Sequence, residues 1–229
     1  MIPIEITIKF KTSFLIGSGF GLAGELDNTA MKDGNQIVFI PGTSIKGVIR
    51  DACVNIAKIR RWNCYDRVID EINDIADQNK DIMDPKNHSY ITQIFGSPLI
   101  PSLFDFGSVY LNPADDHLAD LIRKTVIWSE GHNKINPETR TVLKGHFYAH
   151  EVSMSTEGGE MVDGYSFKCN ITPLQNSIDD KLISLLFCGI RLADRLGAKK
   201  SRGKGVVEFV VPENYSDKSL KEWMGITFN

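Results

Sequence analysis

The densest group of potential ligand-binding residues is a basic loop, LGAKKSRGKGVVEF at residues 196–209, in which cations alternate with glycines. Glycines leave backbone amides open to a ligand, and lysine and arginine side chains add positive charge, so such a loop suits phosphate groups. A P-loop is excluded, because that motif follows a strand and opens a helix, whereas here a helical pattern comes before the loop. The residues predicted to bind phosphate are Gly197, Lys199, Lys200, Ser201, Arg202, Gly203 and Lys204.

A second pattern, FIPGTSIKGVIR at residues 39–50, predicts an anion site at the start of a helix. The proline-glycine turn ends a strand, and Thr43 or Ser44 can cap the helix that follows. Lys46 and Arg50 lie four residues apart and therefore share one exposed face of that helix. A helix start with hydroxyls and nearby cations favours a phosphate.

A third stretch, GSGFGLAG at residues 17–24, departs from the dinucleotide-binding fingerprint. The fingerprint G-x-G-x-x-G needs its third glycine at the position that Leu22 occupies, and it needs a helix directly afterwards. A nicotinamide or flavin enzyme is therefore disfavoured. A glycine loop whose backbone approaches a ligand remains compatible with the pattern.

Charge is segregated along the chain, although the formal net charge is only −3. Residues 195–204 contain five basic side chains and no acidic one, and residues 46–61 contain five against one. Residues 66–84 contain seven acidic side chains and two basic ones. The net charge argues against indiscriminate nucleic-acid binding, while the segregation predicts one face for an anion and another that repels it. Solvated surface charge without a partner is the alternative.

Length and composition indicate one globular domain over residues 1–229. Hydrophobic residues make up 42% of the chain and charged residues 24%, and no linker tract divides it. No run approaches the roughly 18 apolar residues of a membrane-spanning helix. The N-terminal residues also lack the pattern of a signal peptide, so the sequence predicts a cytoplasmic protein with no membrane partner.

The four cysteines form no C-x-x-C pair, so the sequence indicates reduced thiols rather than disulfides or a zinc ribbon. A metal site built from Cys53, Cys64 and His88 is conceivable, but no ligand spacing supports it. The histidines are most simply interpreted as surface or hairpin residues; they are His88, His117, His132, His146 and His150.

Hydrophobic periodicity predicts an α+β protein with a ferredoxin-like antiparallel sheet packed on two helices. The two main helices are expected from residue 43 or 44 to 59 and over 179–195, and a mostly helical insertion over about 60–100 covers the core. Within that insertion, helices are expected at 69–76 and 90–95. A further helix is expected after it, near 117–124. Strands are predicted at 4–10, 37–40, 103–111, 145–154, 165–171 and 206–211.

Residues 21–50 resemble the N-terminal signature of the RAMP superfamily, the RNA-binding proteins of CRISPR systems, and LGAKKSRGKGVVEF resembles that superfamily's C-terminal glycine-rich loop. The resemblance is closest to the guide-RNA-binding backbone subunit of type III CRISPR effector complexes. INPETRTVLKGHFYAHEVS, at residues 135–153, resembles that subunit's arginine-threonine segment before a protruding hairpin. The N-terminal positions that carry the likeness are Asp27, Lys32, Asp33, Pro41, Gly42, Ser44, Lys46, Gly47 and Arg50.

The resemblance implies an RRM-like core that holds the guide RNA backbone without reading its bases. Ser44, Lys46, Arg50 and Arg140, together with the basic loop, would contact RNA. The hairpin, expected at about 135–165, would reach over the guide onto a neighbouring copy. The implied partners are guide RNA, target RNA, other copies of the chain and other type III subunits.

Asp27 stands where the backbone subunit carries an aspartate that cuts target RNA with a divalent metal. The resemblance therefore implies a metal-dependent endoribonuclease acting within a complex, with Asp27 as catalytic and metal-binding residue and Mg²⁺ as the expected ion. Alternatively, Asp27 is a loop aspartate that accepts backbone hydrogen bonds, and the chain is a non-catalytic structural or capping subunit. A guide-processing ribonuclease is disfavoured, because no histidine precedes His88.

Overall fold

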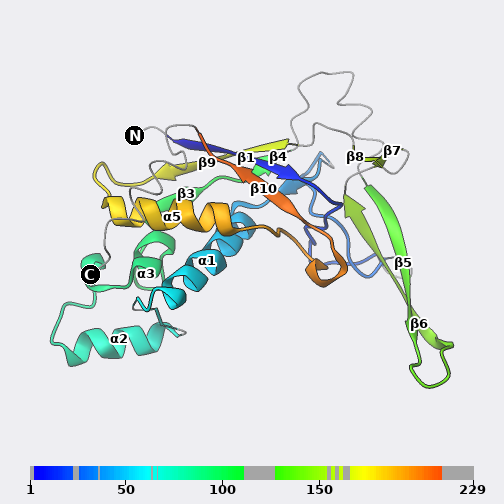
Figure 1. The fold of residues 1–229 in the computed structure, drawn as a ribbon, viewed down its shortest axis with the longest axis horizontal. Helices are drawn as coiled ribbons and strands as arrows, with labels where there is room; N and C mark the ends of the chain where they lie inside the picture. Colours follow the sequence, from blue (N-terminus) through cyan, green and yellow to red (C-terminus); the bar gives the residue numbers. More distant parts are fainter. Residues whose placement is uncertain are drawn as a thin grey trace.

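The computed structural model describes residues 3–22, 26–35, 37–62, 64–65, 67–110, 127–153, 156–157, 160–161 and 166–212. Its centre is a four-stranded antiparallel sheet in the order β10-β1-β9-β3. The strands are β1 (Ile4–Phe10), β3 (Phe104–Phe106), β9 (Ser166–Pro173) and β10 (Val207–Val210). Helices α1 (Gly42–Ile59) and α5 (Asp180–Leu192) cover one face of this sheet (Figure 1).

The order of these elements along the chain is consistent with a ferredoxin-like fold. Two strand-helix-strand units, β1-α1-β3 and β9-α5-β10, interleave so that β1 and β9 occupy the middle of the sheet. The predicted mixed α+β architecture with an antiparallel sheet is therefore confirmed. Alternation along β1 buries Ile4, Ile6, Ile8 and Phe10, which is the period that predicted this strand.

The two main helices contact each other closely at Gly189 of α5. A β-carbon added at Gly189 would lie 2.2 Å from Sγ of Cys53 and 3.2 Å from the carbonyl oxygen of Ile49 on α1. Cys53 is buried, which raises the pKa of its thiol, and that thiol donates a hydrogen bond to the carbonyl of Leu185 at 3.4 Å. The absence of a side chain at Gly189 therefore sets the distance between the helices.

The insertion between α1 and β3 contains helices in its described part. It contains α2 (Val68–Asp77), the short 3-10 helix η1 (Pro85–Asn87) and α3 (Tyr90–Phe95). Buried Glu71 of α2 accepts a hydrogen bond from the Thr92 hydroxyl of α3 at 2.6 Å and lies 3.6 Å from Nδ1 of His88. The Thr92–Glu71 bond joins the two helices, and His88 is a buried residue beside it, not a surface residue as the sequence suggested.

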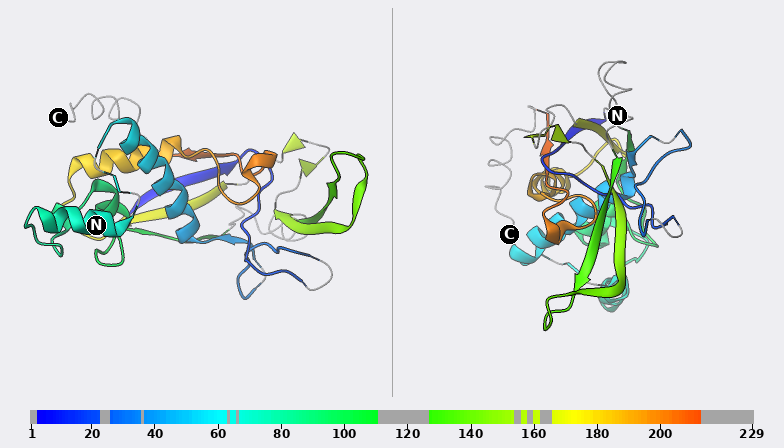
Figure 2. Two further views of the ribbon diagram at one scale, coloured as in Figure 1. Left: turned by 90° about the horizontal axis from the view of Figure 1, so that it is seen from below. Right: turned by 90° about the vertical axis from the view of Figure 1, so that its right-hand side faces the viewer.

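A long hairpin projects from the body of the molecule (Figure 1; Figure 2). Its strands are β5 (Ile127–Ile135) and β6 (Val142–Ser153), so it begins nearer the N-terminus than the predicted bounds of 135–165. Strand β5 was missed, because most of its side chains are partly exposed and few are apolar. The helix predicted near 117–124 lies outside the described residues.

Shorter strands complete the structure. Strand β2 (Phe39–Ile40) pairs with β4 (Val109–Tyr110) directly before α1, and β7 (Thr156–Glu157) pairs with β8 (Glu160–Met161) beyond the hairpin. Within the described residues, no helix combines the length and the apolar character needed to cross a membrane.

The helix contact predicts opposite effects for two alanine substitutions. Gly189→Ala should lower the free energy of unfolding by about 1–3 kcal/mol, because the new methyl group overpacks the contact with Cys53. Gly47→Ala, in α1, should raise it by about 0.5–1 kcal/mol, because nothing lies within 4 Å of the added β-carbon and alanine favours the helix. Urea denaturation measures both, and a Gly189→Ala protein as stable as the wild type would contradict the packing.

Candidate nucleic-acid interface

The two segments that the sequence singled out line one cleft. The cleft has a volume of about 360 Å³ and lies between the start of α1, the basic loop and an N-terminal segment after β1. Segments about 150 residues apart therefore meet. The lining residues are Leu15, Ile16, Gly17, Thr43, Ser44, Gly47, Val48, Asp51, Leu196, Gly197, Ala198 and Lys200.

Backbone hydrogen bonds hold the basic loop against the N-terminal segment. The amides of Ala198 and Gly205 donate to the carbonyls of Leu15 and Ser13, each at 2.8 Å. Gly197 has a φ of 99°, and an added β-carbon would lie 2.6 Å from the carbonyl oxygen of Leu15. Glycine is required there on both counts, so this glycine brings the loop into the cleft.

The start of α1 lies at the cleft. Pro41 is the N-cap residue and makes no side-chain capping bond, the amide of Gly42 donates to the Ser108 hydroxyl at 3.1 Å, and the first turn contains no acidic residue. Thr43 and Ser44 lie inside the helix, so the prediction that one of them is the cap was wrong. Both instead line the cleft, where a hydroxyl and the positive end of the helix dipole favour an anion.

The cations of α1 lie outside the cleft lining. The Lys46 ammonium lies 5.9 Å from the ring centroid of Phe106 on β3, and Arg50 is exposed. They follow Ser44 by two and six residues, which places them on a different face of α1 at 3.6 residues per turn. The structure therefore separates Lys46 and Arg50 from the cleft that Ser44 lines.

The cations of the basic loop have three different environments. Lys200 lines the cleft. Lys199 and Arg202 both lie 5.5 Å from the ring centroid of Tyr148 on β6, and Arg202 also donates a hydrogen bond to the Tyr148 hydroxyl. Lys204 forms an ion pair of 2.6 Å with Glu130 of β5 and is only 13% exposed, so its charge is already partly neutralised.

The remaining predicted residues of the interface do not line the cleft. Ser201 and Gly203 are exposed in the loop, within and after the 3-10 helix η2 (Lys200–Arg202). Arg140 is exposed in the turn that joins β5 to β6, with a φ of 55°. This turn forms the tip of the projecting hairpin (Figure 1), so Arg140 is not brought together with the cleft.

Asp27 lies along one edge of β6. Its amide donates to the carbonyl of Ala149 at 2.7 Å, and the amide of Ala149 donates to Oδ2 of Asp27 at 2.8 Å. The carbonyl of Asn28 accepts from the amide of Glu151 at 3.0 Å, which continues the pairing. Asp27 is nevertheless exposed. The carboxylate therefore accepts a backbone hydrogen bond, as one alternative predicted, and also faces solvent.

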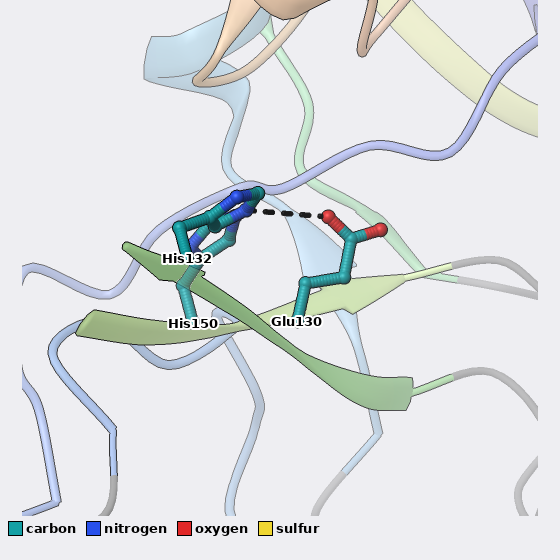
Figure 3. Close-up of side chains that lie close together, drawn as sticks. All are labelled: Glu130, His132 and His150. Atoms are coloured by element: carbon teal, nitrogen blue, oxygen red, sulfur yellow. Dashed lines mark ion pairs between the residues drawn. The ribbon is translucent and has the colours of Figure 1, made fainter. Parts of the chain in front are cut away.

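Sequence reasoning missed a group of three potential metal ligands at the base of the hairpin, namely Glu130, His132 and His150 (Figure 3). It is the only such group among the residues that the structure describes, and it includes neither Asp27 nor the imagined set of Cys53, Cys64 and His88. The sequence did contain a signal for this group. Glu130 and His132 are two residues apart, which is the spacing of residues on one face of a strand. His150 is a hairpin residue, in agreement with its interpretation, but its side chain is buried.

The surroundings of this group favour a neutral His150 and an ionised Glu130. Burial lowers the pKa of His150, and the charge of Lys199 lowers it further, so its imidazole is neutral near pH 7. Burial alone would raise the pKa of Glu130, but the hydrogen bond and the charge of Lys204 lower it below its ordinary value. Glu130 is therefore ionised.

A family model described as RAMP superfamily matches residues 7–208. The chain belongs to the RAMP superfamily. No curated protein matches its sequence.

Solved structures support the fold of this RAMP protein. A chain of Type III-B Cmr-beta bound to cognate target RNA, solved by cryo-EM, is 13% identical with a TM-score of 0.58, and the match covers 97% of this chain and 99% of that one. A chain of the apo state of Type III-B Cmr-beta is also 13% identical, with a TM-score of 0.57 and coverage of 94% and 99%. At this identity the likeness shows a shared fold.

The buried imidazole of this RAMP protein predicts a loss of stability at acidic pH. In the unfolded chain a histidine takes up its proton near pH 6.5, whereas the lowered pKa of His150 makes the folded chain resist protonation. Stability should therefore fall as the pH drops through about 6.5, since the unfolded state binds the proton first.

Replacing the imidazole should weaken that dependence. Urea denaturation between about pH 7.5 and 5.5 in metal-free buffer, on either side of the histidine pKa, should show a smaller loss for His150→Gln than for the wild type. His146→Gln, at an exposed position of the same strand, should keep the wild-type dependence. Identical slopes for His150→Gln and the wild type would contradict the burial of this side chain.

Proposed function

We propose that the chain is an RNA-binding subunit of a type III CRISPR effector complex and that it holds the backbone of the guide RNA in the cleft between α1 and the basic loop. The observation that carries the proposal is the convergence of Ser44, Gly197 and Lys200 on one cleft. Membership of the RAMP superfamily and the fold likeness to Type III-B Cmr-beta chains support it.

The cleft suits phosphates rather than bases. Beside apolar side chains and the carboxylate of Asp51, it combines a helix N-terminus without acidic residues in its first turn, small hydroxyl side chains and a lysine. Such contacts position a strand without reading its sequence, which suits a protein that must accept many guides. Base pairing between guide and target would then supply the sequence recognition.

A path for the RNA continues from the cleft onto the base of the hairpin. Lys199 and Arg202 lie beside Tyr148 at this end of β6, where an aromatic ring and cations can contact an unpaired nucleotide. Target RNA, other copies of the chain and other type III subunits are the partners that this role requires. The projecting hairpin offers them a surface (Figure 2).

Asp27 is the proposed catalytic residue for cutting guide-paired target RNA. Its exposed carboxylate is an oxygen donor of the kind that Mg²⁺ prefers, and Mg²⁺ commonly combines one or two carboxylates with water and substrate phosphates. When bound, the ion would stabilise negative charge on the reacting phosphate. The chain itself fixes the position of Asp27 through its two hydrogen bonds with Ala149.

A non-cutting subunit of the same kind of complex is the second candidate. The hydrogen bond from the Ala149 amide to the Asp27 carboxylate favours it, because that bond gives the aspartate a structural role.

The cleft predicts a local effect of charge on RNA affinity. Lys200→Ala should weaken the binding of single-stranded RNA of any sequence and should lower the salt slope by about 0.7–1, because one phosphate contact is lost. The matched control is Lys168→Ala, which removes the same charge from an exposed lysine paired with Glu5 on the sheet. Equal salt slopes for the two variants, measured by fluorescence anisotropy, would place the RNA elsewhere.

The catalytic proposal predicts that Asp27→Asn lowers Mg²⁺-dependent cleavage of complementary RNA by at least about a hundredfold. Asparagine keeps an oxygen that can accept from the Ala149 amide, so the loop should stay in place and the assembled complex should retain its guide. Cleavage is measured on purified complex with labelled target. Unchanged cleavage by Asp27→Asn would favour the non-cutting subunit.

A further inference from the structure

The base of the hairpin places a carboxylate and two imidazoles on one face of two paired strands. Glu130 lies directly opposite His150 in the register of β5 and β6, and His132 lies directly opposite Tyr148. Residues two apart on a strand share a face, and directly opposed residues have β-carbons about 4.5–5.5 Å apart. The ligand atoms of the three residues all lie within 4.8 Å of one another.

The two imidazoles lack the hydrogen bonds that buried polar groups normally have. His150 is only 2% exposed, and neither of its ring nitrogens has a partner among the described residues. Nε2 of His132 is likewise buried without a partner and lies 3.6 Å from Oε2 of Glu130 (Figure 3). A buried acceptor without a partner is costly, so this arrangement calls for a ligand.

We propose that Glu130, His132 and His150 bind one divalent transition-metal ion, and that Zn²⁺ is the ion that this donor set suits. Two imidazoles and a carboxylate are an established ligand set for Zn²⁺, with water in the fourth position. Mg²⁺ prefers oxygen ligands throughout, so this site differs in chemistry from the one proposed at Asp27. None of the three ligands lines the RNA cleft, although His132 stacks on Tyr148 beside the proposed RNA path, and binding of the ion does not require RNA.

Coordination by both histidines requires a small rearrangement. Their rings are stacked, with centroids 4.8 Å apart and an interplanar angle of 13°, whereas a metal ion lies close to the plane of each ring that binds it. Turning one imidazole about its Cβ–Cγ bond takes that ring out of the stack. The three ligands already share one face of the paired strands.

Lys204 holds the carboxylate from outside the group. Its ammonium contacts Oε1 of Glu130 at 2.6 Å and the hydroxyl of Ser13 at 3.1 Å, while the other carboxylate oxygen faces His132. Partners of this kind orient metal ligands in proteins. Lys204 belongs to the basic loop that lines the cleft. An ion bound to Glu130 would therefore be connected to this loop through the Glu130–Lys204 ion pair.

Titration of the metal-free full chain with Zn²⁺ tests the proposal. Calorimetry should show one ion per chain, and Mg²⁺ in excess should not displace it. His132→Ala and His150→Ala should each weaken binding at least about tenfold, since each removes one of three ligands. His146→Ala is the matched control, because it removes an exposed histidine from β6 outside the group. Absence of binding by the wild type, or equal affinity in all the variants, would overturn the proposal.

X-ray absorption of the zinc-loaded wild-type protein removes any dependence on how the variants fold. The expected spectrum contains two imidazoles and oxygen ligands at about 2.0–2.2 Å. Sulfur ligands at about 2.3 Å would instead place the ion at cysteines and overturn the proposal. Lys200→Ala should bind zinc as tightly as the wild type does, although it is expected to weaken RNA binding. The two proposals are therefore tested independently.

Discussion

The structure depends on the attachment of the basic loop to the backbone of the N-terminal segment. Backbone hydrogen bonds make this attachment, including those that the amides of Ala198 and Gly205 donate, and Gly197 allows it because a side chain there would collide with the carbonyl of Leu15. Without this contact the cations of the loop would be solvated surface charge, and α1 would present an ordinary helix start to water. With it, chain segments from both halves of the sequence form one wall each of a single cleft.

The same attachment divides the cations of the loop among different tasks. Lys200 reaches the cleft, Lys199 and Arg202 lie against Tyr148, and Lys204 is neutralised by Glu130. A run of like charge would repel itself if all its members faced one way. Spreading them over a cleft, an aromatic ring and an ion pair lowers that repulsion. It also couples the loop to the hairpin, so RNA in the cleft and the base of the hairpin share one scaffold.

Periodic patterns foretold the parts of the fold in which one face is buried. Residues 4–10 alternate and form β1 with its predicted bounds, and α3 also has its predicted bounds. Strand β5 carried no such pattern, because it projects from the body and buries little. The two segments that were predicted to bind an anion line one cleft. The separate environments of Lys46 and Lys204 could not be foreseen, because they depend on Phe106 and Glu130, which are distant in sequence.

The most direct measurement for the account is photocrosslinking of the assembled complex with a guide RNA that contains 4-thiouridine at successive positions. Mass spectrometry of the crosslinked peptides then locates the RNA on the chain. The account predicts crosslinks in residues 43–51 and 196–202, on both walls of the cleft. Crosslinks confined to other surfaces, with both walls unlabelled at every guide position, would contradict it.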